Sequence, residues 1–287
     1  MNTPSKPILT QNLKFRVMTG LPLAAAAICY MFIAPLMVFI AISYIIAILA
    51  IWEYCSALRH TNLKFSPIVI YLNALINMAA FASILEGQST LGLYLLAFNV
   101  LVLILASLFR WRSERKLLFW YLLPQIWIVS PIMLIIILRF KIAGDAGSHL
   151  ILFVLLIAIF NDIFAYFGGK KFGKHLLAPV ISPKKTREGS IFGLVGGMVA
   201  GFGLAFYYPF YQFNFSSAWI IATTILCLTF ASQAGDLLES SFKRYCKIKD
   251  SSNLLPGHGG FPDRIDAYLL AIPVFVCILY LLGIPEK

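Results

Sequence analysis

The sequence predicts an all-α, polytopic integral membrane protein with about nine transmembrane helices. Two observations carry this prediction. Hydrophobic residues form 60% of the 287-residue chain and charged residues 12%, and the mean hydropathy is +0.86, whereas a soluble domain is about 45–50% apolar. Apolar stretches also recur at lengths close to the roughly 20 residues that a helix needs to cross a hydrocarbon core of about 30 Å. A lipid bilayer is therefore the expected solvent for most of the chain.

The first predicted span follows Lys6, Lys14 and Arg16, an arrangement that also occurs in signal peptides. The many later spans favour an uncleaved first helix. A short break at Ala34-Pro35 separates the first two spans. If they formed one helix, the N-terminus would lie on the other side of the membrane and the C-terminal half would be unaffected. In order, the predicted spans are residues 17–34, 36–51, 67–85, 91–109, 117–138, 149–168, 191–208, 218–234 and 267–282.

The distribution of basic residues predicts the orientation. With a cytoplasmic N-terminus, 20 of the 23 Lys and Arg residues fall on the cytoplasmic side, and only Arg139, Lys141 and Lys287 fall outside it. Cytoplasmic loops carry an excess of Lys and Arg, so we interpret the net charge of +11 as a consequence of the membrane topology. The basic loops would also contact anionic lipids and phosphates, and the charge does not indicate nucleic acid binding. We expect a multi-pass protein of the inner (plasma) membrane with its active site on the cytoplasmic side.

Four carboxylates are expected near that cytoplasmic boundary. Asp162 comes late in the sixth span, Asp236 follows the eighth, and Asp263 and Asp266 precede the ninth. Ionisable residues within spans are costly, and those that face the protein interior are functional-site candidates. Carboxylates beside Lys, Arg and a glycine turn fit Mg²⁺, which prefers oxygen ligands and substrate phosphates. These residues indicate phosphoryl or nucleotidyl transfer.

Residues 235–244 are predicted to extend the eighth helix beyond the membrane. If the helix continues further, Asp236, Ser240, Lys243 and Lys247 lie on one helix face. Glycines in the stretch that follows let the backbone approach a ligand closely, and successive amides there could cradle a phosphate. His258 in this stretch has two interpretations, a solvated loop histidine or a phosphate contact, and we do not expect it to act as a base.

The other long loop, residues 169–190, holds six Lys and Arg residues. Ser182 followed by Pro183 fits an N-cap with Pro at the first helical position, so the next helix is predicted to begin there, with the positive end of its dipole near an anionic group. The five cysteines show no metal-ligand spacing, and we expect neither disulfides nor zinc.

A longer pattern connects these features. Residues 240–266 contain Ser-x-Phe-Lys-Arg, then Lys-Asp after four residues, then Leu-Pro-Gly-His-Gly-Gly and Asp-Arg-Ile-Asp. Asn161-Asp162 through Tyr166 and the run from Ser182 to Thr186 accompany them. The combination resembles the phosphatidate cytidylyltransferase family over roughly the last 130 residues. Upstream of Leu150 the resemblance is limited to the number of spans and the Glu53-Tyr54 pair.

The resemblance implies an enzyme that converts CTP and phosphatidic acid to CDP-diacylglycerol and pyrophosphate, with Mg²⁺ in a two-cation site. It implies that Asp236 and Asp263 are the main metal carboxylates, and that Lys243 and Arg264 act with them in catalysis. The weaker metal candidates are Asp162, Asp250 and Asp266. The residues implied in binding nucleotide or lipid phosphate are Ser240, Arg244, Lys249, His258, Gly259, Gly260, Lys184, Lys185 and Thr186.

The predicted organisation is an N-terminal transmembrane region, residues 1–148, and a C-terminal transmembrane catalytic region, residues 149–287. Membrane lipids are expected partners, and a homodimer is compatible with the sequence. Three alternative functions differ in the sequence features that they require. A secondary transporter predicts broken helices in corresponding halves, and no such symmetry is evident. A CDP-alcohol phosphotransferase would carry a DGxxAR-type run, which is absent. A CDP-lipid synthase with another acceptor fits the same motifs.

Overall fold

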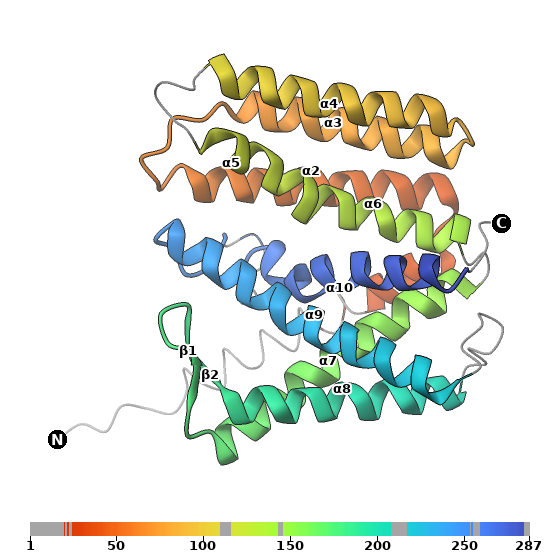
Figure 1. Ribbon diagram of the computed structural model, residues 1–287, viewed down its shortest axis with the longest axis vertical. Helices are drawn as coiled ribbons and strands as arrows, with labels where there is room; N and C mark the ends of the chain where they lie inside the picture. Colours follow the sequence, from red (N-terminus) through yellow and green to blue (C-terminus); the bar gives the residue numbers. More distant parts are fainter. Residues whose placement is uncertain are drawn as a thin grey trace.

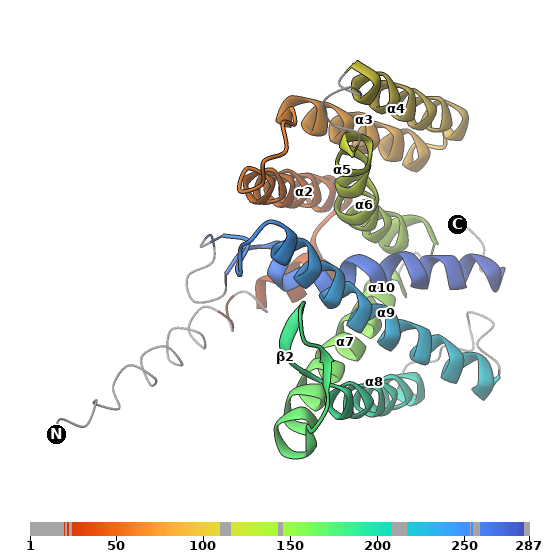
Figure 2. The ribbon, with the colours of Figure 1, turned by 60° about the vertical axis from the view of Figure 1, so that its left-hand side comes forward.

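The computed structural model describes residues 20, 22, 25–109, 116–142, 146–207, 217–252, 254 and 259–283. Long helices run side by side across the molecule (Figure 1). Figure 2 shows α3 and α4 as the outermost layer on one side and α7 and α8 on the other, with α2, α6, α9 and α10 between them. The protein is an all-α polytopic membrane protein, with one small β-hairpin among the described residues.

The helices fall where the hydropathy pattern predicts them. Seven in the described part of the chain are long and apolar enough to cross a membrane, with α5 to η2 counted as one span from Leu117 to Phe140. The first predicted span, residues 17–34, is described only at residues 20, 22 and 25–34, of which residues 25–33 are helical. Helix α4 contributes a shorter apolar helix, Ser89–Leu105. The elements are α2 (Leu36–Leu58), α3 (Pro67–Leu85), α4 (Ser89–Phe109), α5 (Leu117–Pro124), η1 (Gln125–Val129), α6 (Ser130–Ile137), η2 (Leu138–Ile142), α7 (Gly147–Phe172), β1 (Leu176–Ala178), β2 (Ser182–Thr186), α8 (Arg187–Tyr207), α9 (Ala218–Tyr245) and α10 (Pro262–Leu281).

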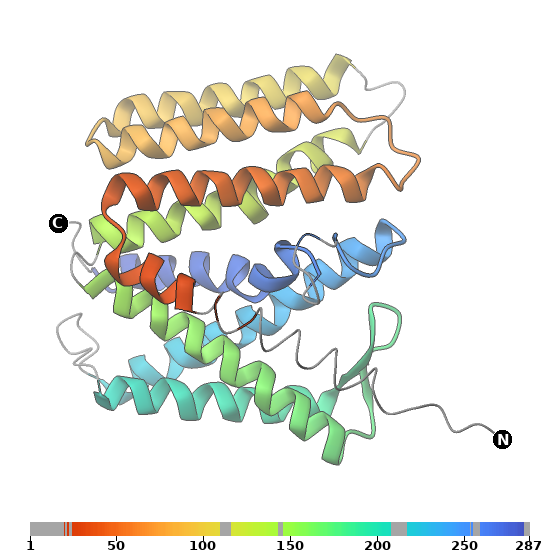
Figure 3. The ribbon, with the colours of Figure 1, turned by 180° about the vertical axis from the view of Figure 1, so that it is seen from behind.

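The predicted break between the first two spans is confirmed. Residues 34 and 35 interrupt the helical backbone, and Pro35 is extended at φ −66° and ψ 159°. The view from behind shows the change of direction where α2 begins (Figure 3). Met31 at this corner is fixed from across the bundle, because its carbonyl oxygen accepts hydrogen bonds from Arg139 Nε at 2.9 Å and Ser148 Oγ at 2.6 Å.

The helix ends that flank the connections rich in basic residues lie at one end of the bundle. In Figure 1 the last turns of α2, α4, α7 and α9 and the first turns of α3, α5, α8 and α10 point to the left, toward the β-hairpin. This alternation is what the predicted topology requires. The assignment of that end to the cytoplasm stays a prediction from the charge distribution.

One predicted helix start is wrong. The segment that begins at Ser182 is strand β2, which pairs antiparallel with β1 in the register Leu176 to Thr186 and Ala178 to Ser182. Helix α8 begins only at Arg187. The reason is that Thr186 provides the cap, since its Oγ1 accepts a hydrogen bond from the backbone nitrogen of Gly189 at 3.1 Å.

Glycines at every fourth position let α8 pack closely against its neighbours. A Cβ at Gly189 or Gly193 would meet α7, at Ala165 O (2.8 Å) and Asn161 Oδ1 (2.6 Å) respectively, and one at Gly197 would meet Thr229 of α9 at 2.6 Å. Small residues at this spacing allow membrane helices to approach backbone to backbone. This close packing brings the polar residues of α7, α8 and α9 together.

Gly193→Ala tests that packing. We expect a loss of about 1–3 kcal/mol in the free energy of unfolding, because the added methyl group overpacks a filled contact. The measurement is thermal unfolding in detergent. Gly203→Ala is the matched control in the same helix, because a Cβ there meets nothing within 4 Å. A melting temperature for Gly193→Ala equal to that of the control would contradict the packing argument.

Candidate active site

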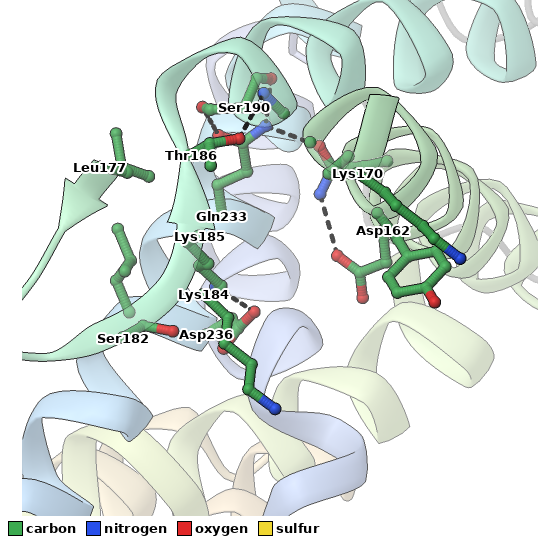
Figure 4. A pocket seen from close by; sticks show the side chains of 16 residues that line it. Asp162, Lys170, Leu177, Ser182, Lys184, Lys185, Thr186, Ser190, Gln233 and Asp236 are labelled. Carbon is green, nitrogen blue, oxygen red and sulfur yellow. Dashed lines mark hydrogen bonds and ion pairs between the residues drawn. The ribbon is translucent and has the colours of Figure 1, made fainter. Parts of the chain in front are cut away.

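A cavity of about 450 Å³ opens where the β-hairpin meets α7, α8 and α9. Figure 4 shows Asp162 of α7 and Asp236 of α9 with their carboxylates directed into the space between these helices and β2. The lining residues are Asn161, Asp162, Ala165, Tyr166, Gly169, Lys170, Leu177, Ser182, Lys184, Lys185, Thr186, Gly189, Ser190, Gln233, Asp236 and Leu237. The cavity therefore combines two carboxylates with three lysines.

The Lys185–Asp236 ion pair crosses the cavity. Lys185 Nζ donates to Asp236 Oδ2, and the two side chains are 29% and 27% exposed. Ser240, one turn further along α9, lies 3.5 Å from Asp236 Oδ1. Both charges remain accessible to a ligand, so an incoming anion could bind Lys185 and an incoming cation could bind Asp236.

A network of neutral side chains supports the wall of the cavity. Gln233 Nε2 donates to Asn161 Oδ1 at 2.7 Å and to the carbonyl oxygen of Ser190 at 3.0 Å, and Ser190 Oγ donates to Gln233 Oε1. Asn161 Nδ2 in turn donates to Asp162 Oδ1 at 3.1 Å. The orientation of Asp162 is thus tied to α8 and α9 as well as to its own helix. Gln233 and Ser190 were missed by the sequence analysis, although Gln233 is a polar residue at the end of an apolar span.

Asp263 belongs to a second cluster, which does not line this cavity. Its Oδ1 accepts from Lys243 Nζ at 2.7 Å, and its Oδ2 accepts from Ser251 Oγ at 3.0 Å and from the backbone nitrogens of Gly260 (2.8 Å) and Ser251 (3.2 Å). Lys243 also pairs with the buried Glu239 at 2.7 Å. Asp263 therefore holds the start of α10, the end of α9 and the loop between them.

The two clusters are joined by α9. Asp236 and Lys243 are seven residues apart on this helix, about 10 Å along its axis. Asp266 of α10 is near residues of both clusters. Its carboxylate is close enough to interact electrostatically with Asp236 and Asp162 and with Lys243. The prediction that one helix carries Asp236, Ser240, Lys243 and Lys247 is confirmed for the first three residues. It is wrong for Lys247, because α9 ends at Tyr245 and Lys247 has a left-handed φ of 58°.

The remaining predicted residues are peripheral or lie outside the described residues. Arg244 is exposed and ties the hairpin to α9, because its Nε donates to the carbonyl oxygen of Ile181 at 3.1 Å. Lys249 and Arg264 are exposed. Gly259 has a left-handed φ of +81°, which favours glycine. His258 falls on a stretch outside the described residues.

No group of three or more His, Cys, Asp or Glu side chains among the described residues is spaced to hold a metal ion by itself. The donor set of the cavity nevertheless suits a hard cation. Mg²⁺ commonly takes one or two carboxylates and completes its shell with water and substrate phosphates. Asp162 and Asp236 supply that number of carboxylates within one cavity. The four hydrogen bonds to Asp263 leave its oxygens engaged by protein donors.

The fold and this site define a class, a polytopic helical membrane protein that gathers carboxylates and lysines at one end of its bundle. Comparison with known proteins is specific about the family. A family model described as "Cytidylyltransferase family" matches residues 14–282. The chain belongs to this family.

Curated relatives carry the name phosphatidate cytidylyltransferase. The protein of Haemophilus influenzae is 32% identical, and the match covers 92% of this chain and 97% of that protein. The proteins of Staphylococcus aureus (strain COL) and Staphylococcus haemolyticus are 43% and 41% identical over 133 residues. In both cases this match covers 46% of this chain and half of the relative's length.

Proposed function

We propose that this protein is a phosphatidate cytidylyltransferase, a nucleotidyltransferase that converts CTP and phosphatidic acid to CDP-diacylglycerol and pyrophosphate. The observation that carries the proposal is the cavity in which Asp162 and Asp236 face the lysines of β2 at the basic end of a membrane-spanning bundle. The printed names of the relatives from Haemophilus and Staphylococcus support the same activity.

In the proposed reaction an oxygen of the lipid phosphate attacks the α-phosphorus of CTP. The new bond is the phosphoanhydride of CDP-diacylglycerol, and the bond that breaks joins the α-phosphorus to the oxygen that leaves with pyrophosphate. A phosphate monoester is already largely ionised at neutral pH, so no general base is required. What the reaction needs is alignment of two polyanions and neutralisation of their charge.

The cavity residues suit those two tasks. Lys184 and Lys185 of β2 and Lys170 of α7 supply positive charge to the cavity, where they would hold phosphate oxygens. Because Lys185 is paired with Asp236 before substrate arrives, a phosphate that binds Lys185 would compete for its ammonium group and free Asp236. This exchange would make the carboxylate more available to a cation when the nucleotide is present.

We propose Mg²⁺ as the cofactor, held by Asp236 with Asp162 and the phosphates of CTP. When bound, it would polarise the phosphate oxygens and offset the charge that develops on the leaving group. A second cation at Asp263, as in the two-cation site that the family resemblance implies, would require Lys243 to leave Asp263 Oδ1, which it contacts at 2.7 Å. The expected location is the inner membrane, with the site facing the cytoplasm and with membrane lipids around the bundle.

The direct test is an assay of the full-length protein, purified in detergent. We expect CDP-diacylglycerol to form only when CTP, phosphatidic acid and Mg²⁺ are all present, with one pyrophosphate released per product. Chelation with EDTA should abolish the reaction, and added Mg²⁺ should restore it. Substitution of another phosphorylated lipid for phosphatidic acid distinguishes the CDP-lipid synthases with other acceptors. Absence of product under the complete conditions would reject the proposal.

A further inference from the structure

Glu53 of α2 is completely buried, yet all its side-chain hydrogen-bond partners among the described residues come from a loop about 200 positions later in the chain. Its Oε2 accepts from Ser251 Oγ at 2.7 Å and its Oε1 from Ser252 Oγ at 2.9 Å. The backbone nitrogen of Phe261 donates to both oxygens, at 3.0 and 3.1 Å. The exposed fraction of Glu53 is 0%. A glutamate of the N-terminal half therefore accepts hydrogen bonds from the loop that joins α9 to α10.

A buried carboxylate is costly unless donors compensate it, so its position within an apolar helix calls for a role. The loop backbone at Gly260 leaves no room for a side chain beside this carboxylate. A Cβ at Gly260 would lie 2.2 Å from Glu53 Oε2 and 1.8 Å from Ser251 Oγ, so only glycine fits between the carboxylate and the serine. The loop backbone thus approaches Glu53 as closely as atoms allow.

The same loop holds Asp263. Ser251 Oγ lies between the two carboxylates, 2.7 Å from Glu53 and 3.0 Å from Asp263, which share its single hydroxyl proton. The backbone nitrogen of Gly260 donates to Asp263, and that of the next residue, Phe261, donates to Glu53. A shift of the loop at Glu53 must therefore move the donors that orient Asp263.

The end of α2 is itself fixed to α9. Tyr54 stacks on Phe242, with ring centroids 4.8 Å apart and an interplanar angle of 7°, and its hydroxyl donates to the carbonyl oxygen of Trp120 at 2.8 Å. Phe242 is adjacent in sequence to Lys243, the partner of Asp263. Glu53 is thus next to a residue that packs on α9 beside Lys243, one of the predicted catalytic residues.

We infer that Glu53 is a positioning residue for the nucleotidyl transfer, and that α2 is part of the catalytic architecture rather than only a membrane anchor. This inference rests on the proposed function. Glu53 acts through residues 251, 252, 260 and 261 of the loop, which it holds in the conformation that orients Asp263 and Lys243. Neither Glu53 nor the described residues of this loop line the cavity, so Glu53 affects the chemical step more than the binding of substrates.

The test compares Glu53→Gln with Glu53→Leu, two uncharged side chains of similar size. Gln retains a carbonyl oxygen for Phe261 and an amide that can donate to the serine oxygens, whereas Leu offers no hydrogen bond. We expect Glu53→Leu to lower kcat per folded molecule by about 10²-fold, the effect of a displacement of about 1 Å at a reacting centre. KM for CTP and for phosphatidic acid should change by less than about threefold, and Glu53→Gln should restore most of kcat.

Ser43→Ala is the matched control. Ser43 is a buried polar residue in the other half of α2, bonded to Tyr30, and its loss should leave kcat unchanged. If Glu53→Leu fails to fold, Ser252→Ala replaces it, and we expect a smaller fall in kcat because Glu53 loses one of its donors. A wild-type kcat for Glu53→Leu, or for Ser252→Ala where it replaces Glu53→Leu, would overturn the inference.

Limited trypsin digestion provides a readout that does not depend on activity. Lys247 and Lys249 are exposed at the start of the loop, and we expect cleavage there to be faster in Glu53→Leu than in the wild type or Ser43→Ala. Equal cleavage rates would overturn the anchoring role even if the wild type proved inactive. An inactive wild type with faster cleavage in Glu53→Leu would reject the proposed function and retain the anchor.

Discussion

Asp236→Asn is expected to lower kcat for CDP-diacylglycerol formation by about 10³-fold or more, because it removes the carboxylate that faces the phosphates in the cavity. The change is nearly isosteric, and the side chain of Asp236 is 27% exposed. Its partner Lys185 is also partly exposed and remains solvated without it. We therefore expect the thermal unfolding of the variant in detergent to stay close to that of the wild type.

The experiment needs both kinetic and structural readouts. Turnover is measured with saturating CTP, phosphatidic acid and Mg²⁺, and the Mg²⁺ concentration for half-maximal rate is determined for each variant. Glu86→Gln is the control, because Glu86 is an exposed carboxylate at the end of α3, on the opposite end of the bundle from the hairpin. Wild-type turnover in Asp236→Asn, with unchanged Mg²⁺ dependence, would refute the assigned role of Asp236.

Asp263→Ala is expected to remove activity and to destabilise the protein as well. Asp263 and Lys243 are only 8% and 15% exposed, and removal of one partner of such a buried pair costs about 3–5 kcal/mol. Lys243 keeps its contact with Glu239, so we expect the lower end of this range. The backbone donors of Ser251 and Gly260 also lose their acceptor, which would loosen the loop.

Thermal unfolding in detergent and turnover per folded molecule are measured together, with Asp236→Asn as the reference. If Asp263→Ala is inactive but as stable as Asp236→Asn, the hydrogen bonds seen here contribute little, and a direct role at the cation gains support. If Asp263→Ala retains CTP-dependent turnover, Asp263 is not needed for catalysis. The comparison thus separates a residue that holds the site from one that takes part in it.

The sequence identified most of the candidate site because its residues stand out locally. Asp162, Asp236 and Lys185 are charged residues beside apolar spans, and the structure brings all three to one cavity. Glu53 was noted only as part of a family-like pair, although a glutamate inside an apolar helix is itself a signal. Its partners could not be predicted, because nothing in a periodic pattern relates residue 53 to residues 251–261.

The helix predicted from Ser182 shows a different kind of error. Ser182 and Thr186 both match the preference for N-caps, and local propensity does not choose between them. The antiparallel pairing of β1 with β2 decides in favour of Thr186. Strand pairing is a nonlocal interaction, and here it overrides a plausible local one.

By itself, the sequence determined that the chain crosses a membrane repeatedly, where its helices lie, and that acidic and basic residues gather at their ends. These properties follow from hydropathy and spacing, which act over a few turns of helix. Only the tertiary structure decided that the carboxylates divide between a cavity at Asp236 and a buried cluster at Asp263, and that α2 supports the second. Such contacts depend on how helices pack side by side, and at Gly193 and Gly260 they are so close that an added Cβ would clash with a neighbouring side chain.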